Sequence, residues 1–396
     1  MKSLNKIILI RGIFMDFLFT KEQEEFREKV IALLNTAEIQ EKRKMIKKAN
    51  LDSDPREIYR ILGEQGLLAP NFPSEFGGLN KTLIEAAILV EEMSNSGIPE
   101  ALHVLTSLII GNVILLSATK SQKEKYLPQL ADGSKNACIL YSEPKHGSDL
   151  SSLESRAYNN EDLGTYSIFG RKVYSMKTHI SDYGLIAVRT SEKQSKYDGL
   201  SLFMVPLNSE GVTISEIPSL SDESLYEVIL DGVVVDNTCM IGKENDGWSV
   251  INKALSVERT GLDYFVRAKR WFDLIYTREI NNIPTESTLI ELSRLRCKLD
   301  ASRYLTYKVI NEFNRLGAVD ESLSAISKLY ASELACEVVW KGHELRGVEA
   351  CLKDNHGYSE LYGSLESAYR EAPGLTLSAG TSEMMLETIS KLRLTI

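Results

Sequence analysis

A carboxylate in an apolar helical stripe is the first candidate for chemistry in this sequence. Around Glu258, the apolar residues Ile251, Leu255, Leu262 and Phe265 recur at the i, i+3/i+4, i+7 spacing that places them on one face of a helix. An unpaired carboxylate in such a stripe loses hydration, which raises its pKa towards neutrality and suits it to act as a general base. A Glu258 that pairs with an Arg or Lys inside a helical bundle explains the same pattern equally well.

A polar turn that follows an apolar run is the second candidate. The run and turn read Ile139-Leu-Tyr-Ser-Glu-Pro-Lys-His-Gly-Ser-Asp149, with a hydroxyl at Ser142, a carboxylate at Glu143 and glycine and serine at Gly147 and Ser148. Glycine permits close backbone approach, and serine hydroxyls donate hydrogen bonds to phosphate or carbonyl oxygens. From these residue types alone, a tight turn that caps a strand is the favoured interpretation, and a cofactor-binding turn is the second one.

Other catalytic patterns are missing from the sequence. The segment His343-Glu-Leu-Arg-Gly347 begins like a zinc-protease helix, but glycine stands where the second histidine is needed. The five histidines never cluster at metal-ligand spacing, and the sequence has neither a P-loop nor a serine within a G-x-S-x-G motif. We therefore predict no metal site and find little support for a hydrolase.

Charge and cysteine usage limit the partners and the compartment. The formal net charge of −9 disfavours a general affinity for nucleic acid or anionic membranes. Five scattered cysteines without a C-x-x-C motif are typical of a reducing cytoplasm. The apolar run Ile7–Ile10 is too short for a secretory or membrane segment. We expect a cytoplasmic protein without nucleic-acid or membrane partners, in which residues 1–14 are an extension.

The residue pattern of the sequence changes twice along the chain. Helical periodicity dominates up to residue 128, beginning with a capping box at Thr20 and Gln23, and it returns from Gly247 to the end. We expect one helix over Trp248–Arg270 and a loop over Arg370–Gly374. Between the helical parts, closely spaced β-rich runs predict an antiparallel sheet or a small barrel. These runs are Ala137–Tyr141, Thr165–Phe169, Leu185–Arg189, Leu200–Val205, Val212–Ile217 and Glu227–Val235.

The combination of these features resembles the acyl-CoA dehydrogenase family. The order of the three parts agrees with that family from about Phe17 to the C-terminus, and the joint occurrence of the motifs is specific. The motifs are Gln122-Lys-x-Lys-Tyr-Leu-Pro128, Ser142-Glu-Pro-x-x-Gly-Ser-Asp149, Gly170-Arg-Lys172, Glu258-Arg259 and Ala379-Gly-Thr-Ser-Glu383. The resemblance implies an α+β fold with an N-terminal all-α domain over residues 17–128, a middle β-barrel domain over 129–240 and a C-terminal four-helix bundle over 241–396.

The resemblance also implies an activity and a site. Members of the family desaturate acyl thioesters with FAD, a glutamate takes the proton next to the thioester carbonyl, and electrons usually pass to an electron-transfer flavoprotein. By position, the substrate would meet Ser148, Arg259 and Gly380. The residues that would line FAD are Tyr141, Ser142, Gly147, Ser148, Tyr174, Ser175, Met176, Thr381 and Glu383. We expect FAD as the cofactor and a homo-oligomer, a dimer or tetramer, or a hetero-oligomer.

The position of the base resembles a subgroup of the family. Most members place the catalytic glutamate directly before the Gly-Thr of the last motif, where this sequence has Ala379. The isovaleryl-CoA dehydrogenase type instead carries its glutamate on the first helix of the bundle, and Glu258 matches that position. The apolar stripe and the resemblance thus converge on Glu258 as the catalytic base.

Several residues depart from the family pattern. Met176 replaces a hydroxyl residue near the flavin, and Lys145 and His146 replace small residues in the turn. Arg278–Thr285 stands where the family has a segment that holds FAD from a neighbouring subunit, and Lys353–Asp354 stands where the family has paired glycines. The acyl group could therefore be carried by a carrier protein instead of CoA. A non-catalytic partner subunit of a hetero-oligomeric dehydrogenase is also consistent with these departures, as is a flavin oxidase or monooxygenase on the same scaffold.

Overall fold

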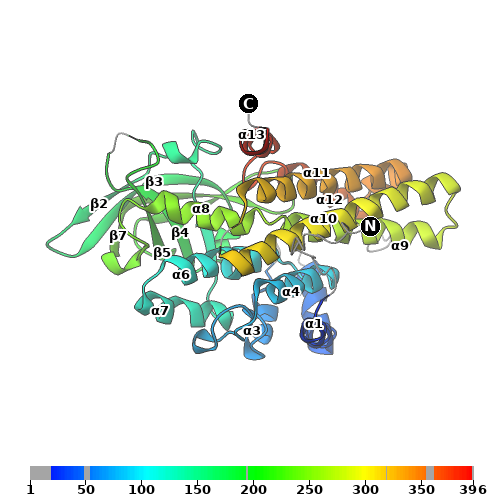
Figure 1. Ribbon diagram of the computed structural model, residues 1–396, viewed down its shortest axis with the longest axis horizontal. Coiled ribbons are helices and arrows are strands. Elements are labelled where there is room, and N and C mark those ends of the chain that lie inside the picture. Colours follow the sequence, from blue (N-terminus) through cyan, green and yellow to red (C-terminus); the bar gives the residue numbers. More distant parts are fainter. Residues whose placement is uncertain (1–18, 49–53, 193–194, 318, 354–360, 395–396) are drawn as a thin grey trace, which may run out of the picture.

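The computed structural model describes all residues except 1–18, 49–53, 193–194, 318, 354–360 and 395–396. Its sheet lies at one end, a helical bundle at the other, and the N-terminal helices lie beneath both (Figure 1). The chain therefore has the α+β order that the sequence predicts. The proposed extension, residues 1–14, and Asp354 lie outside the described residues.

Helices fill the N-terminal part of the chain. Threonine N-caps with a Gln or Glu three residues later start α1, α4 and α7, because these side chains satisfy the free N–H groups of the first turn. From Ala101 to Ser117 the helix is continuous but widens into a π-helical segment. The elements are α1 (Lys21–Leu34), α2 (Ala37–Lys48), α3 (Arg56–Glu64), η1 (Ser74–Phe76), α4 (Leu83–Asn95), α5 (Ala101–His103), η2 (Val104–Gly111), α6 (Asn112–Ser117) and α7 (Lys120–Ala131).

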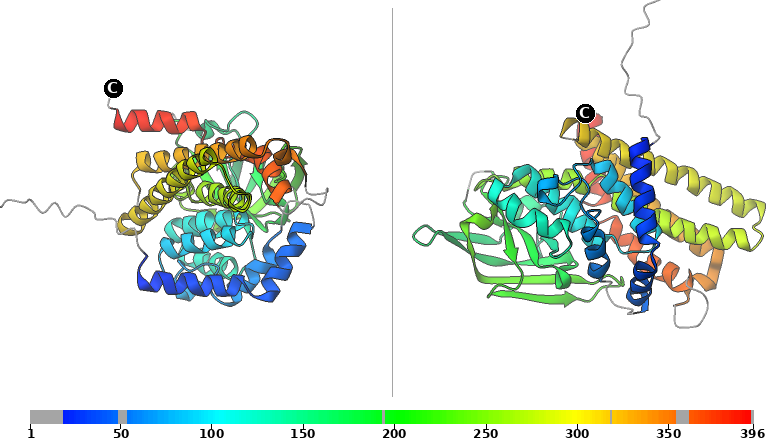
Figure 2. Two further views of the ribbon diagram at one scale, coloured as in Figure 1. Left: turned by 90° about the vertical axis from the view of Figure 1, so that its right-hand side faces the viewer. Right: turned by 90° about the horizontal axis from the view of Figure 1, so that it is seen from below.

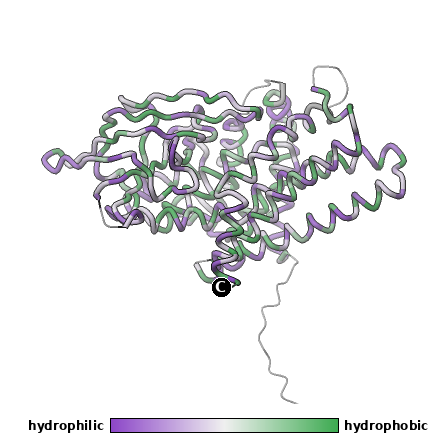
Figure 3. The backbone as a smooth tube through the Cα atoms, turned by 90° about the horizontal axis from the view of Figure 1, so that it is seen from above, coloured by the Kyte–Doolittle hydropathy of each residue, from purple (hydrophilic) through white to green (hydrophobic). Residues whose placement is uncertain are grey.

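The middle part is one eight-stranded sheet. Its strands run in the order β6-β7-β3-β2-β4-β5-β8, and β1 pairs with β4 in parallel. The β2–β3 hairpin projects from the sheet with a hydrophilic tip (Figure 3). The strands are β1 (Ala137–Leu140), β2 (Arg156–Asn160), β3 (Thr165–Met176), β4 (Tyr183–Arg189), β5 (Leu200–Pro206), β6 (Val212–Ile217), β7 (Leu225–Asp236) and β8 (Met240–Ile241), with short 3-10 turns η3 (Leu150–Ser152), η4 (Thr178–Ile180) and η5 (Asn237–Cys239).

Two of these strands do not appear among the predicted ones. Strand β2 reads Arg-Ala-Tyr-Asn-Asn and has a single buried side chain, so it lacks the apolar alternation that marks a strand in sequence. Strand β8 is only two residues long. Both are held by pairing with longer neighbours, β2 with β3 and β8 with β5.

The C-terminal part is helical. Helices α9, α10, α11 and α12 share one apolar core that reaches α4 of the N-terminal part, and α13 packs on α11 at the margin of the molecule (Figure 2). The turn between α9 and α10 extends farthest from the sheet (Figure 1). The elements are α8 (Gly247–Glu258), α9 (Leu262–Asn281), α10 (Glu286–Leu316), α11 (Glu321–Arg346), η6 (Gly347–Cys351), α12 (Leu361–Leu375) and α13 (Ser382–Arg393).

Two predictions about this helical part are wrong. The expected single helix over Trp248–Arg270 is broken after Glu258, because Gly261 adopts a left-handed conformation with φ of 87°. The expected loop over Arg370–Gly374 is instead helical, as the last part of α12 with Pro373 inside it. Proline ends most helices through its missing N–H, but here only two residues of the helix follow it.

Candidate active site

The turn after β1 is anchored by a buried ion pair. Lys172 of β3 is fully buried and donates hydrogen bonds to the carboxylate of Glu143, at 2.7 Å, and to the carbonyl of Tyr141, at 3.2 Å. The Glu143 carboxylate also accepts from the backbone N–H groups of Glu154 and Ser155. Burial alone would raise the pKa of Glu143, but Lys172 and these hydrogen bonds hold it below its ordinary value.

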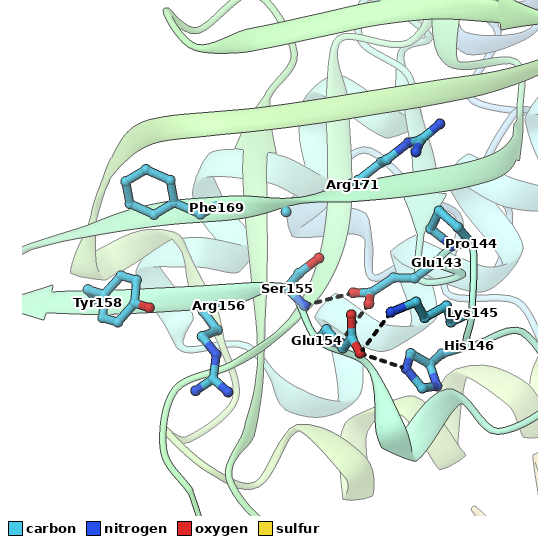
Figure 4. A pocket seen from close by; sticks show the side chains of 11 residues that line it. Glu143, Pro144, Lys145, His146, Glu154, Ser155, Arg156, Tyr158, Phe169 and Arg171 are labelled. Atoms are coloured by element: carbon cyan, nitrogen blue, oxygen red, sulfur yellow. Dashed lines mark hydrogen bonds and ion pairs between the residues drawn. The ribbon is translucent and has the colours of Figure 1, made fainter.

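A cavity of about 720 Å³ lies between this turn and the β2–β3 hairpin. Lys145 and His146, which replace small residues of the family pattern, both face Glu154 there, at 3.9 and 3.5 Å (Figure 4). Exposed aromatic rings of Tyr158 and Phe169 line its far side. Lys145 and His146 thus line a surface cavity between the turn and the β2–β3 hairpin.

The three residues at the end of β3 point in different directions. Tyr174 lies on an irregularity of the β3–β7 pairing, with φ of 61° and a side chain 59% exposed. Ser175 is buried, and its hydroxyl donates to the carbonyl of Tyr226 and lies 2.6 Å from the hydroxyl of Thr178. Met176 is partly buried. Of the three, only Tyr174 is exposed.

Glu258 is the last residue of α8, at the break before α9, and it is partly exposed. The C-terminal end of a helix carries a partial negative charge, so a carboxylate there gains no stabilisation from the helix dipole. Burial raises the pKa of Glu258 to about 7, with Arg259 and Lys328 opposing the rise and Asp263 adding to it. A carboxylate with this pKa is half deprotonated near neutral pH, as a general base requires.

The loop before α13 packs against the same helix break. Arg259 donates through Nε to the carbonyl of Ala379, at 3.0 Å. Ala379 and Gly380 both have positive φ, 55° and 102°, and a Cβ at Gly380 would lie 3.3 Å from the Arg259 guanidinium. Arg259 and Ala379 are 120 residues apart in sequence, so the fold alone places them in contact. The structure therefore brings Glu258, Arg259 and Gly380 together at one place.

The remaining residues of that loop have local roles. Thr381 caps α13, its hydroxyl accepting from the N–H of Met384 at 3.3 Å. Glu383 lies in the first turn of α13 and is exposed, and hydrogen bonds at this helix start, from its own backbone and from Thr381, lower its pKa. The structure therefore places both residues beside the site, where the Thr381 hydroxyl oxygen accepts the capping hydrogen bond and keeps its own O–H to donate.

Tyr141 connects the sheet to this helix break. Its side chain is 7% exposed, its hydroxyl has no hydrogen-bond partner among the described residues, and burial followed by the charge of Glu258 raises its pKa. Burying a hydroxyl without a partner is unfavourable, so this hydroxyl is suited to form a hydrogen bond with a ligand group that enters the site.

Ser142, Gly147 and Ser148 of the turn after β1 are more exposed than Tyr141. Ser142 is partly buried, and its carbonyl accepts a hydrogen bond of 2.9 Å from the N–H of Val173 in β3. Gly147 and Ser148, at the end of the turn, are exposed, and a Cβ at Gly147 would meet no atom within 4 Å. The turn is thus tied to the sheet at its start and open to a ligand at its end.

Spacing in the sequence does not reveal a charged cluster beside the site. Arg267 of α9 is 4% exposed and lies 3.7 Å from Glu100, 3.5 Å from Glu223 and 3.4 Å from Asp263, and it also pairs with Glu371 of α12. Most of these partners come from distant segments, so no local pattern could have shown them. The cluster joins the N-terminal helices, the sheet and the bundle at one point.

Lys328 of α11 is a second residue without a signature in the sequence. It is fully buried, and its ammonium group lies 3.3 Å from the carbonyl of Thr376 and 5.2 Å from the centre of the Tyr264 ring. The Tyr264 hydroxyl in turn lies 3.1 Å from the hydroxyl of Ser378. A lysine within a long amphipathic helix looks like a surface residue in sequence, so only the fold shows that it reaches the site.

The chain combines a helical domain, a β-sheet domain and a helical bundle, with a carboxylate and an arginine at the start of the bundle. Three family models match the chain: the N-terminal, middle and C-terminal domains of acyl-CoA dehydrogenase, over residues 20–134, 138–233 and 245–393. The chain belongs to the acyl-CoA dehydrogenase family, a family of oxidoreductases that act on the CH–CH group of acyl thioesters.

Individual relatives agree with this assignment over nearly the whole chain. Acyl-CoA dehydrogenase FadE26 of Mycobacterium tuberculosis is 25% identical, over 96% of this chain and 98% of its own. The subunit CarC of the caffeyl-CoA reductase-Etf complex of Acetobacterium woodii is 26% identical, over 85% and 89%. The solved structure of the ChsE4-ChsE5 complex from Mycobacterium tuberculosis shares the fold, with a TM-score of 0.84, 24% identity and coverage of 96% and 99%.

Among the described residues, no group of three or more His, Cys, Asp or Glu side chains is arranged to hold a metal ion. Within the same part of the chain, no helix is both long and apolar enough to cross a bilayer.

Proposed function

We propose that the protein is an FAD-dependent acyl thioester dehydrogenase in which Glu258 is the catalytic base. The observation that carries the proposal is the position of Glu258, a carboxylate with a pKa of about 7 beside Arg259 and the Ala379–Thr381 loop. Removing a proton next to a thioester carbonyl needs a base that is deprotonated near neutral pH. Glu258 meets this requirement, and Arg259 offers a positive charge to the substrate.

The residues that the family pattern assigns to the flavin fit this cofactor in part. Three groups can contact a ring system and its polar edge: the Tyr141 hydroxyl, which no described residue pairs with, the exposed Ser148 and the exposed Tyr174. Ser175 does not fit, because its hydroxyl is already hydrogen-bonded inside the sheet. When bound, a flavin supplies an acceptor for the hydride equivalent from the β-carbon of the acyl chain. Glu258 would hold the α-proton, and Arg259 would orient the thioester, together with the backbone at Gly380.

The Glu258→Gln variant tests the base. Glutamine keeps the shape of the side chain but cannot accept the proton, so we expect a yellow protein whose absorbance no longer bleaches when an acyl thioester is added without oxygen. Bleaching of the parent protein and of Glu286→Gln, an exposed carboxylate at the start of α10, is the control. Bleaching of Glu258→Gln at the parent rate would remove Glu258 from the mechanism. Comparing CoA thioesters with carrier-protein thioesters in this assay identifies the carrier.

A second candidate function is that of a partner subunit in a hetero-oligomeric dehydrogenase. The turn between α9 and α10, within the segment Arg278–Thr285, projects from the molecule and carries Ile283 with 92% of its surface exposed. Burying this apolar side chain against another subunit would remove its surface from water, which is favourable. Two relatives named above belong to complexes, ChsE4-ChsE5 and caffeyl-CoA reductase-Etf. An electron-transfer flavoprotein is accordingly the expected electron acceptor.

The absorbance spectrum of the purified chain separates the two candidates. A chain that is yellow alone, or becomes yellow with FAD, supports the dehydrogenase. A colourless chain that stays colourless with added FAD, and that binds flavin only together with a homologous chain, supports the partner subunit. Rapid reoxidation of the bleached protein by oxygen would favour a flavin oxidase or monooxygenase. The mass of the assembly in solution, measured by light scattering, gives the oligomeric state in each case.

A further inference from the structure

Lys328 contacts both of the segments that form the candidate active site. On one side, its ammonium group lies 3.3 Å from the carbonyl of Thr376, at the start of the loop that leads to Ala379 and Gly380. On the other side, it lies over the ring of Tyr264, in the first turn of α9, with 5.2 Å between the ammonium and the ring centre. A cation over an aromatic ring and beside a carbonyl is attracted to both.

The neighbouring residue of α11 strengthens this arrangement. Ser327 donates a hydrogen bond of 2.7 Å to the carbonyl of Thr260, within the break between α8 and α9. Consecutive residues of one helix therefore hold the break that carries Glu258 and the loop that lies against it. Because α11 is a 26-residue helix packed in the core of the bundle, these contacts fix the site to a rigid element.

The charges around Lys328 show what else it can do. A buried ammonium is unfavourable without compensation, and carboxylates from three segments provide it. The charged groups that act on Lys328 are Glu258 and Arg259 from the α8–α9 break, Glu333 from α11 and Glu383 from α13. Burial and Arg259 lower the pKa of Lys328 to about 8, so it is mainly positive at pH 7 and becomes neutral as the pH rises through about 8.

We propose that Lys328 is a positioning residue for this reaction: it holds the Thr376–Thr381 loop against the α8–α9 break and supplies a positive charge that favours the deprotonated form of Glu258. This inference rests on the proposed role of Glu258 for its effect on turnover. The expected effect of Lys328 on the protonation of Glu258 can be measured without turnover.

The test compares two substitutions that separate charge from hydrogen bonding. Lys328→Gln removes the charge and retains a donor, whereas Lys328→Arg retains the charge. In Lys328→Gln we expect the titration of the Glu258 carboxylate, followed by ¹³C NMR and assigned with Glu258→Gln, to move upwards by about one pH unit. The acid limb of the pH profile of kcat/KM should move with it. Lys328→Arg should restore both towards the parent values.

The controls distinguish this role from a purely structural one. Tyr264→Phe removes the hydroxyl near Ser378 without changing any charge at neutral pH, so it should alter stability without moving the carboxylate titration. Lys308→Gln, at an exposed lysine on α10, should change neither. An unchanged carboxylate titration in Lys328→Gln, or an equal shift in Lys328→Arg, would overturn the proposal. If Glu258→Gln retained turnover while Lys328→Gln still shifted the carboxylate, the base assignment would fail and the electrostatic role of Lys328 would stand.

Discussion

In this site, the pKa and the role of a side chain depend on its surroundings as well as on its residue type. Glu143 and Glu258 are both glutamates close to Tyr141, yet their pKa values move in opposite directions. Glu143 meets the buried Lys172 and two backbone N–H groups, which stabilise its charged form. Glu258 lies at a helix C-terminus, where burial disfavours the charged form. The first carboxylate is suited to hold the turn and the second to accept a proton.

The Glu143–Lys172 pair makes a prediction about stability. Glu143→Gln leaves Lys172 buried without its counter-charge, which should cost about 3–5 kcal/mol of the free energy of unfolding at pH 7. Because the pKa of Glu143 is lowered in the folded protein, its stabilisation is present above the unfolded pKa and is lost as the pH falls through the folded value. Urea unfolding at pH 7 and at low pH measures both effects.

The matching double variant is the control for this prediction. Glu143→Gln combined with Lys172→Met removes both charges, and we expect it to recover most of the lost stability, because a missing pair costs less than an unpaired buried charge. A double variant as unstable as Glu143→Gln alone would show that the turn depends on the hydrogen bonds of Glu143 and not on its charge.

Among the elements, the break between α8 and α9 is the one on which the site depends. Gly261 has φ of 87°, and a Cβ there would lie 2.7 Å from the hydroxyl of Ser327, which is itself bonded to Thr260. Gly261→Ala should therefore destabilise the protein by about 1–3 kcal/mol and displace Glu258 and Arg259. Thermal unfolding and the bleaching assay measure the two effects.

A second glycine of the bundle provides the matched control. Gly374 lies in α12 without a positive φ, and a Cβ there would meet no atom within 4 Å. Gly374→Ala should be neutral or slightly stabilising, because alanine loses less conformational freedom in a helix. Equal losses of stability in Gly261→Ala and Gly374→Ala would contradict the role given to the break.

For the molecule as a whole, the sequence predicts the order of the three parts and the family correctly. Apolar periodicity identifies the helices because they bury one face, and β-rich runs identify the long strands. The break at Gly261 stays hidden because the apolar spacing around Glu258 continues through it, and β2 stays hidden because pairing alone holds it. Lys328 and Arg267 have partners from distant segments, which no local pattern shows. The predicted domain boundaries stay predictions.

Because Glu258 is only partly buried, ligand binding should change its protonation. A thioester that fills the site displaces the water that still reaches this carboxylate, so its pKa should rise above about 7 in the complex. Binding near neutral pH should then be accompanied by proton uptake, and affinity should weaken as the pH rises.

Calorimetric titration with an unreactive thioether analogue, in two buffers of different ionisation enthalpy, measures this uptake. Glu258→Gln should show none, and equal uptake in that variant would assign the proton to another group. The form of the protein that binds its ligand most tightly is then the protonated form, which cannot act as a base. The fastest turnover should therefore occur at a higher pH than the tightest binding.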